Sequence, residues 1–375
     1  MLTRRALNRA LLARQGLLQR HRLGVEEAVG EVLAIQAQEP VSPYLSLWSR
    51  IDGFRPEDLH EAFASARVTK ATLFRLTLHA VRHDDLAVFH RALQPMLRGR
   101  LAHGLTRRAG VTAAHAAAVE DEVLAFLDRP RSNAEVEAWL DEGGHPGRGL
   151  WWALRGHLPV RHAATGGPWS FGLRPAYVAA ASAPSRPDQP AAHEALTRLV
   201  RRYLGSFGPA SPVDFARFTK LPMGPIRAAF AALSDQVEIL AGPDGKPLHD
   251  LPDAPRPAED TPAPPRLLPM WDSVLLAHDD RKRIVPEAYR GAIVRSNGDT
   301  LATVLVDGFV AGVWRPVAGG TEVTAFETFD AATWAALADE AALLEGLLAA
   351  RERTIHTRYH RWFADVPAAQ VRVLG

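Results

Sequence analysis

Residues 56–82, PEDLHEAFASARVTKATLFRLTLHAVR, decide the fold class of this chain. Pro56 and the two acidic residues after it are typical of the first turn of a helix, because proline fits the first helical position and carboxylates favour the positive end of the helix dipole. Leu59 and Phe63 then lie on one apolar face. The run 67–82 mixes apolar residues with threonines and predicts two strands. Helices followed by a β-hairpin are typical of a winged-helix unit.

The same order of helices and strand-like runs recurs twice, more weakly, along the chain. In the second copy Ser132 is expected to cap a helix, and in the third copy Ser211-Pro212 opens one. We therefore predict an α+β fold, mainly α, in which tandem winged-helix units precede a β-rich C-terminal portion with a terminal helix. The predicted boundaries are residues 1–108, 109–182 and 193–242 for the three units and residues 266–375 for the C-terminal domain.

The last third of the chain has a different pattern. Proline-rich stretches at residues 183–192 and 243–266 are expected to connect the units. Beyond them, apolar residues between 293 and 314 predict strands, with Asp307-Gly308 as a hairpin turn. An alanine- and leucine-rich helix is expected over residues 331–353.

The composition excludes several classes of function. The chain has 375 residues, 47% of them hydrophobic and 23% charged, which is an ordinary globular balance. It contains no cysteine, so disulfides, thiol nucleophiles and thiolate metal sites are excluded. Because the 15 histidines form no HExxH motif, and no phosphate-binding glycine loop or GxSxG motif occurs, we expect no metal and no cofactor. Without a long apolar run or a secretory signal, a cytoplasmic protein with no membrane contact is expected.

The charge is unevenly distributed. Residues 1–108 carry 17 Lys and Arg against 10 Asp and Glu, and nearly all the basic residues of the chain are arginines. Arginine suits phosphates and guanine edges, although a GC-rich genome gives the same bias. Arg4 and Arg5, with Arg9, are therefore either phosphate contacts or part of a solvated helix face.

The stretch Ile35 to Pro40 contains two glutamines, Gln36 and Gln38. Gln36 is expected to extend the helix over residues 25–33, and Pro40 keeps the residue before it out of helical geometry. From the residues alone, the simplest interpretation is a polar helix end whose amides satisfy unpaired carbonyls.

Six short motifs follow one another along the chain. Their ordered combination is more specific than any single motif. They are Leu2-Thr3-Arg4-Arg5-Ala6, Ala34 to Pro40, Ser42-Pro43-Tyr44, Arg75-Leu76-Thr77-Leu78-His79, Tyr203 to Pro209 and Leu275 to Arg281. From residue 2 to about residue 315 the chain resembles the winged-helix DNA glycosylases that unhook interstrand crosslinks. The resemblance implies that Gln36, Ala37 and Gln38 match the catalytic Gln–apolar–Gln triplet, the form associated with self-resistance enzymes of antibiotic producers.

The chemistry of two amides fits a cationic leaving group. An N7-alkylated guanine leaves as a neutral base, so little general acid is needed, and a glutamine carbonyl can hold water or face the sugar cation. An amide cannot take a full proton. We therefore predict a monofunctional DNA glycosylase, in keeping with the few lysines, that acts on double-stranded DNA carrying bulky N7-alkylguanine adducts or crosslinks. No obligate protein partner is expected.

The predicted wing hairpin adds three candidate residues. Strand alternation is expected to place Arg75, Thr77 and His79 on one face, toward a phosphate or the site. The alternative interpretation is that His79 is a buried structural residue. Whether His79 or Glu39 takes part in catalysis stays open. The alternative function is a non-catalytic winged-helix regulator or adduct-binding protein, which the repetition of the unit disfavours.

Overall fold

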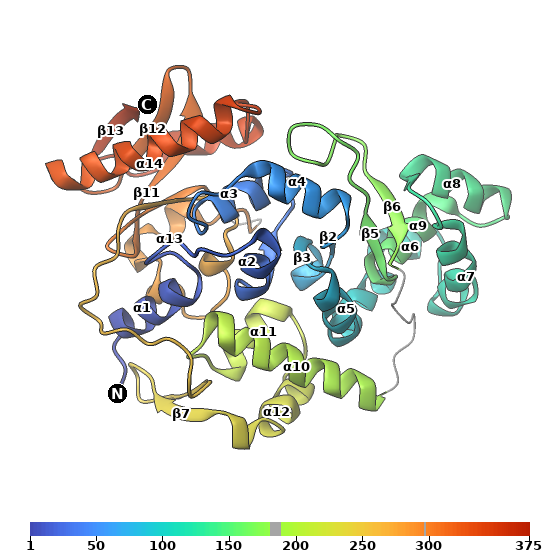
Figure 1. Cartoon of the computed structure of the whole chain (residues 1–375). Helices are drawn as coiled ribbons and strands as arrows, with labels where there is room; N and C mark the ends of the chain where they lie inside the picture. Colours follow the sequence, from blue (N-terminus) through green and yellow to red (C-terminus); the bar gives the residue numbers. More distant parts are fainter. Residues whose placement is uncertain (181–188, 296–297) are drawn as a thin grey trace.

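The computed structural model describes residues 1–180, 189–295 and 298–375, and it mixes helices and strands (Figure 1). The connection predicted at residues 183–192 and the predicted boundary at residue 182 lie partly outside this range. Helix α1 (Arg4–Arg14) begins as predicted at Thr3, whose side chain accepts a hydrogen bond from the backbone of Ala6.

The first repeat, residues 25–82, contains the predicted hairpin. Its elements are α2 (Val25–Glu31), β1 (Ile35–Gln36), α3 (Ser42–Trp48), α4 (Pro56–Ala64), β2 (Val68–Thr72) and β3 (Leu78–Arg82). The strands are antiparallel in the order β1-β3-β2. The turn between β2 and β3 is the 3-10 helix η1 (Phe74–Leu76). Helix α5 (His83–Leu97), η2 (Arg98–Ala102) and α6 (Gly104–Arg108) lead to the next repeat.

The second repeat, residues 113–179, has the same order of elements. These are α7 (Ala113–Phe126), β4 (Arg131–Ser132), α8 (Asn133–Glu142), α9 (Gly147–His157), β5 (Val160–His162) and β6 (Ala176–Ala179). As predicted, Ser132 caps α8. Because Lys70 of β2 pairs with His162 of β5, the two repeats join edge to edge in one six-stranded sheet, β1-β3-β2-β5-β6-β4.

The third repeat, residues 189–250, follows the same plan. It comprises α10 (Gln189–Phe207), α11 (Pro212–Thr219), α12 (Met223–Ala231), η3 (Ser234–Gln236), β7 (Glu238–Ala241) and β8 (Pro247–Asp250). Ser211 caps α11 as predicted. A single bridge between Ala210 and His249 occupies the place of a first strand. Helix α10 packs on α5, which ties this repeat to the first one.

The C-terminal part is built around a five-stranded antiparallel sheet of order β13-β12-β11-β10-β9. Its elements are β9 (Arg266–Leu268), η4 (Ser273–Leu275), η5 (Arg281–Arg283), α13 (Glu287–Ile293), β10 (Thr303–Val306), β11 (Phe309–Val317), β12 (Gly320–Ala325), α14 (Ala331–Ala349), η6 (Thr357–Asp365) and β13 (Gln370–Leu374). The predicted Asp307-Gly308 turn joins β10 to β11, with both residues at positive φ. The prediction of strand from residue 293 was wrong, because Ile293 ends α13 and packs in the core.

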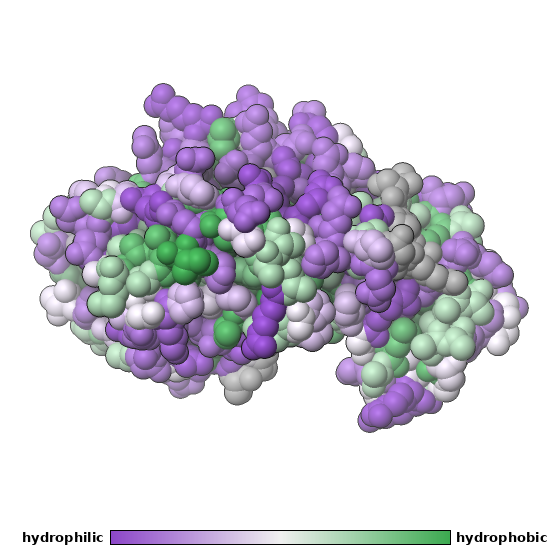
Figure 2. All heavy atoms as spheres, turned by 90° about the horizontal axis from the view of Figure 1, so that it is seen from below, coloured by the Kyte–Doolittle hydropathy of each residue, from purple (hydrophilic) through white to green (hydrophobic). Residues whose placement is uncertain are grey.

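Two hydrophobic cores explain the outline of the molecule. One core contains Phe63, Tyr203 and Trp314, and therefore joins the first repeat, the third repeat and the C-terminal sheet. The second repeat has a core of its own around Trp151. It projects from the rest of the molecule in Figures 1 and 2. Among the described residues, no helix combines the length and apolarity needed to cross a bilayer.

Candidate active site

Gln36 lies on a strand, so the prediction that it extends a helix was wrong. Helix α2 stops before Leu33, which has φ 72° and a fully buried side chain. A positive φ cannot continue an α-helix, and the chain instead enters β1, where Gln36 pairs with His79 of β3. The strand pairing fixes the backbone of the glutamine triplet.

The two glutamines line one cavity of about 560 Å³, which we call the glutamine cavity. The Gln36 side chain is 4% exposed, and its Oε1 accepts a hydrogen bond of 2.9 Å from the backbone N–H of Gln38. Gln38 is exposed and lines the cavity. One amide is therefore held rigidly and the other is accessible.

Five cations line the same cavity. Four of them we call the cation cluster: Arg75, Arg217, Lys220 and Arg281; the fifth is Arg358. The four of the cluster come from η1, α11, the residue that caps α11, and the start of η5. The Arg75 guanidinium donates to the carbonyl of Phe218 at 3.0 Å. Burial and the neighbouring guanidinium groups lower the pKa of Arg75 to about 10, and burial with neighbouring cations also lowers the pKa values of Lys220 and Arg281. Such mutual repulsion favours the binding of an anion.

The predicted trio Arg75, Thr77 and His79 is only partly brought together. Arg75 and Thr77 line the cavity, but Arg75 lies in the turn with φ 56° rather than on the strand, so the one-face prediction was wrong. His79 is completely buried and does not line the cavity. Its Nδ1–H donates to the carbonyl of Thr77 at 3.1 Å, and its Nε2 lies 3.5 Å from Nη2 of Arg75. Because burial and Arg75 lower its pKa to about 3, His79 is a neutral residue that supports the turn.

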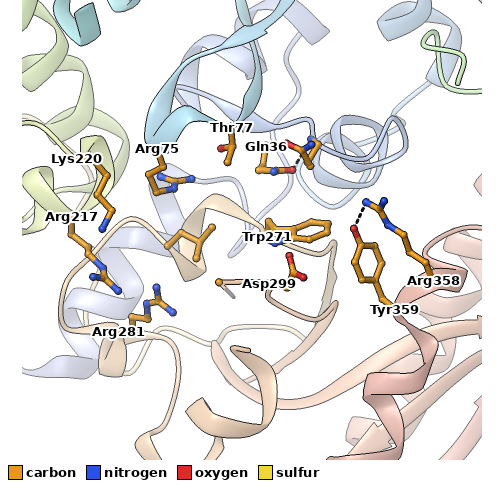
Figure 3. A pocket seen from close by; sticks show the side chains of 13 residues that line it. Gln36, Arg75, Thr77, Arg217, Lys220, Trp271, Arg281, Asp299, Arg358 and Tyr359 are labelled. Atoms are coloured by element: carbon orange, nitrogen blue, oxygen red, sulfur yellow. Dashed lines mark hydrogen bonds between the residues drawn. The ribbon is translucent and has the colours of Figure 1, made fainter. Parts of the chain in front are cut away.

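An aromatic wall faces the amides. The rings of Trp271 and Tyr359 meet edge to face at 5.2 Å, and both line the cavity. The Tyr359 hydroxyl donates to Oε1 of Glu39 at 3.1 Å, and Arg358 pairs with the same carboxylate. Glu39 is therefore engaged at the edge of the site. Figure 3 shows the cation cluster at one end of the cavity, and the aromatic wall with Arg358 toward the other.

Several lining residues were missed from the sequence. They are Arg217, Lys220, Trp271, Arg281, Arg358, Tyr359 and the carboxylate Asp299. Arg281 ends one of the six ordered motifs, and that was the available signal for it. The others come from separate elements whose proximity depends on the folded core.

The N-terminal arginines do not reach this cavity. Arg5 donates to Asp307 in the β10–β11 turn, with Nη2 to Oδ1 at 2.9 Å, and Arg9 pairs with the same carboxylate. Arg4 lines a different hollow beside α11. Arg5 therefore fastens α1 to the C-terminal sheet.

Comparison with known proteins agrees with this geometry. Residues 29–347 match the family model for AlkZ-like DNA glycosylases, which covers most of the chain. The chain belongs to the AlkZ-like DNA glycosylase family. It is therefore a DNA repair enzyme that acts on N-glycosyl bonds in DNA, and the resemblance identified from the ordered motifs is confirmed.

A solved structure supports the fold. Streptomyces sahachiroi DNA glycosylase AlkZ superimposes with a TM-score of 0.78 over 94% of this chain and 98% of the other, at 21% sequence identity. At that identity, the likeness establishes a shared fold. A comparison with curated proteins gave no match.

Proposed function

We propose that this glycosylase hydrolyses the N-glycosidic bond of bulky N7-alkylguanine adducts or interstrand crosslinks, and so protects a cell from a DNA-alkylating natural product that it makes. The observation that carries the proposal is the composition of the glutamine cavity. Two amides, Gln36 and Gln38, share it with a cation cluster and an aromatic wall. In this proposal the enzyme works in the cytoplasm, on the cell's own DNA.

The amides suit a leaving group that already carries a positive charge. Alkylation at N7 makes guanine a neutral leaving base, so the enzyme mainly stabilises the sugar cation and places a water. The oxygen of Gln36 is occupied by the backbone of Gln38. We therefore assign the water and the sugar cation to the accessible carbonyl of Gln38, and the positioning of that residue to Gln36.

The rest of the cavity would hold the nucleotide. The cation cluster suits the phosphate of the target nucleotide, because guanidinium groups form paired hydrogen bonds with phosphate oxygens. Trp271 and Tyr359 offer ring surfaces to a displaced base or a planar adduct. In this arrangement the cation cluster contacts the negatively charged phosphate, and the two aromatic rings contact the bulky adduct.

Attack by water, which makes the enzyme monofunctional, is part of the proposal. Lys220 is the one amine that lines the glutamine cavity. It is exposed and lies among the arginines of the cation cluster, where a phosphate is expected. Trapping with borohydride should therefore give no covalent adduct between the protein and abasic DNA.

We also propose that the three repeats are winged-helix units in tandem. In the first two, the order is helix, strand, helix, helix and two strands, and the third strand pairs with the first. The third repeat has the same order, with a single bridge in the place of the first strand. The boundaries predicted from the sequence remain part of this proposal, with the third hairpin extended to Asp250.

Base release tests the proposal directly. A duplex with a single bulky N7-alkylguanine is incubated with excess enzyme, and abasic sites are revealed by alkaline cleavage. We expect release by the unmodified protein, a smaller loss for Gln36→Ala or Gln38→Ala alone, and no release by the double variant, which should still bind the duplex. Normal single-turnover release by the double variant would remove the glutamines from the mechanism.

A further inference from the structure

A second hollow lies beside the glutamine cavity, at the junction of the first two repeats. It has a volume of about 470 Å³, and we call it the junction hollow. Strands β2 and β5 meet at its wall through Lys70 and His162. Gln38 lines both spaces, so the junction hollow opens next to the candidate active site.

Lys70 is the least expected residue in the junction hollow. It is 4% exposed, and within the described residues it forms no salt bridge. Its ammonium group lies 4.4 Å from the ring centroid of Phe171. Burial lowers its pKa to about 8, although Glu39 acts in the opposite direction. A buried ammonium without a paired carboxylate is costly, which indicates a site built for a ligand.

Two arginines of the same hollow have only neutral partners in the described structure. Arg100 donates to the carbonyls of Leu76 and Trp152, both at 3.4 Å. Arg155 donates to Asn133 at 2.9 Å and to the hydroxyl of Tyr177 at 3.2 Å. Burial and Arg155 lower the pKa of Arg100, so these two cations repel each other.

The fold makes room for this arrangement. A Cβ at Gly156 of α9 would lie 2.2 Å from Cδ of Arg100, so the glycine lets the arginine run along the helix. Glu39 is the carboxylate that lines the hollow, and Arg358 already pairs with it. His162 is buried, and its pKa lies well below the usual value because of burial and Lys70, so it is neutral.

We propose that the junction hollow binds a backbone phosphate of DNA through Lys70, Arg100 and Arg155, on the other side of Gln38 from the cation cluster. The inference rests on the proposed function, because it places the damaged strand across Gln38 between two cationic spaces. A phosphate fits the three donors, since guanidinium forks and a compact ammonium both favour tetrahedral oxyanions. The interaction is independent of base sequence and positions the strand.

Neutral backbone analogues test the inference. Duplexes carry one N7-alkylguanine and one methylphosphonate, placed in turn at each phosphate on either side of the lesion. We expect one position at which the methylphosphonate weakens binding to the unmodified protein roughly three- to tenfold, as removal of one ionic interaction predicts. With Lys70→Met, the methylphosphonate at that position should cost clearly less, because only Arg100 and Arg155 then remain to bind the phosphate, and the slope of log affinity against log salt should be less steep.

Two further variants serve as a charge control and as an independent test of Arg100. Arg22→Gln removes an exposed cation, with 88% of its side chain accessible, and serves as the control for net charge. Gly156→Ala displaces Arg100 without removing any charge. It should likewise reduce the cost of the methylphosphonate at the same position. The inference is overturned if the methylphosphonate costs the same in Lys70→Met as in the unmodified protein at every position.

The two proposals can fail separately. Base release at limiting enzyme should fall in Lys70→Met in step with its weaker binding, whereas Arg22→Gln should release the base as the unmodified protein does. If release by the unmodified protein is absent while the methylphosphonate effect holds, the proposed function fails and the phosphate site stands. If release is normal and the methylphosphonate effect is absent, only the junction site fails.

Discussion

At the scale of single residues, the cavity contains one carboxylate whose role the sequence did not raise. His79 is buried and neutral, and Glu39 is engaged by Arg358 and Tyr359. Asp299 lines the glutamine cavity itself, opposite the labelled Gln36 in Figure 3. A carboxylate there can stabilise the sugar cation without acting as an acid.

Asp299→Asn should therefore slow release of N7-alkylguanine by about tenfold, a typical loss for one electrostatic interaction of roughly 1.4 kcal/mol. Uracil and hypoxanthine should stay uncleaved in both proteins, because neither amides nor an ionised carboxylate can protonate a neutral base. Single-turnover assays on a panel of duplexes measure both. Efficient uracil release that Asp299→Asn abolishes would instead make Asp299 a general acid.

Lys70 adds a pH dependence to DNA binding. Its pKa is lowered to about 8 by burial, Glu39 acts in the opposite direction, and the neutral His162 lies next to it. Arg100 and Arg155 line the same hollow. A phosphate binds the protonated amine, so affinity for undamaged duplex should fall as the pH rises from 7 to 9. Fluorescence anisotropy on the unmodified protein and Lys70→Met tests this, and equal slopes in the two would contradict it.

At the scale of elements, local sequence signals predicted where helices begin, but they could not predict a strand that forms only through long-range pairing. Thr3, Ser132 and Ser211 begin helices because their side chains bond to backbone within three residues. Gln36 was misplaced because β1 exists only through its pairing with β3, which starts 42 residues later at Leu78. The positive φ of Arg75 likewise follows from packing of the folded turn.

The β10–β11 turn gives a test of how one element is fastened to another. A Cβ on Gly308, at φ 81°, would lie 2.5 Å from Oδ1 of Asn8 and 2.6 Å from Cδ1 of Leu12 in α1. Gly319, in the next turn at φ 91°, has no such neighbour within 4 Å. Gly319→Ala should cost about 1–2 kcal/mol from backbone strain alone.

Gly308→Ala should cost at least about 2 kcal/mol more, because it adds overpacking against α1 to the same strain. Chemical denaturation of the two variants and the unmodified protein measures the difference. Equal losses of stability would show that α1 yields easily and is not rigidly held by this turn.

At the scale of the whole molecule, the basic first third of the sequence is redistributed by folding. The sequence predicted a basic first third, but it could not show which of its arginines are neutralised internally. Arg5 and Arg9 pair with Asp307, and Arg14 is buried against Asp250 at 2.7 Å. The cation cluster instead draws Arg217, Lys220 and Arg281 from the acidic remainder of the chain. Part of the positive charge that is not neutralised internally therefore lies beside the glutamines.

This redistribution predicts which arginines set the salt dependence of DNA binding. Replacing both Arg217 and Lys220 by Met should make the slope of log affinity against log salt less steep by about 0.9 for each phosphate that the variant no longer neutralises. Arg5→Met should leave the slope unchanged and lower the melting temperature, because it removes a part-buried pair between α1 and the C-terminal sheet. Titrations of undamaged duplex from about 50 to 200 mM salt, with thermal melts of each variant, separate the two effects. A shallower slope in Arg5→Met, with unchanged stability, would return the phosphate-binding role to the N-terminal helix.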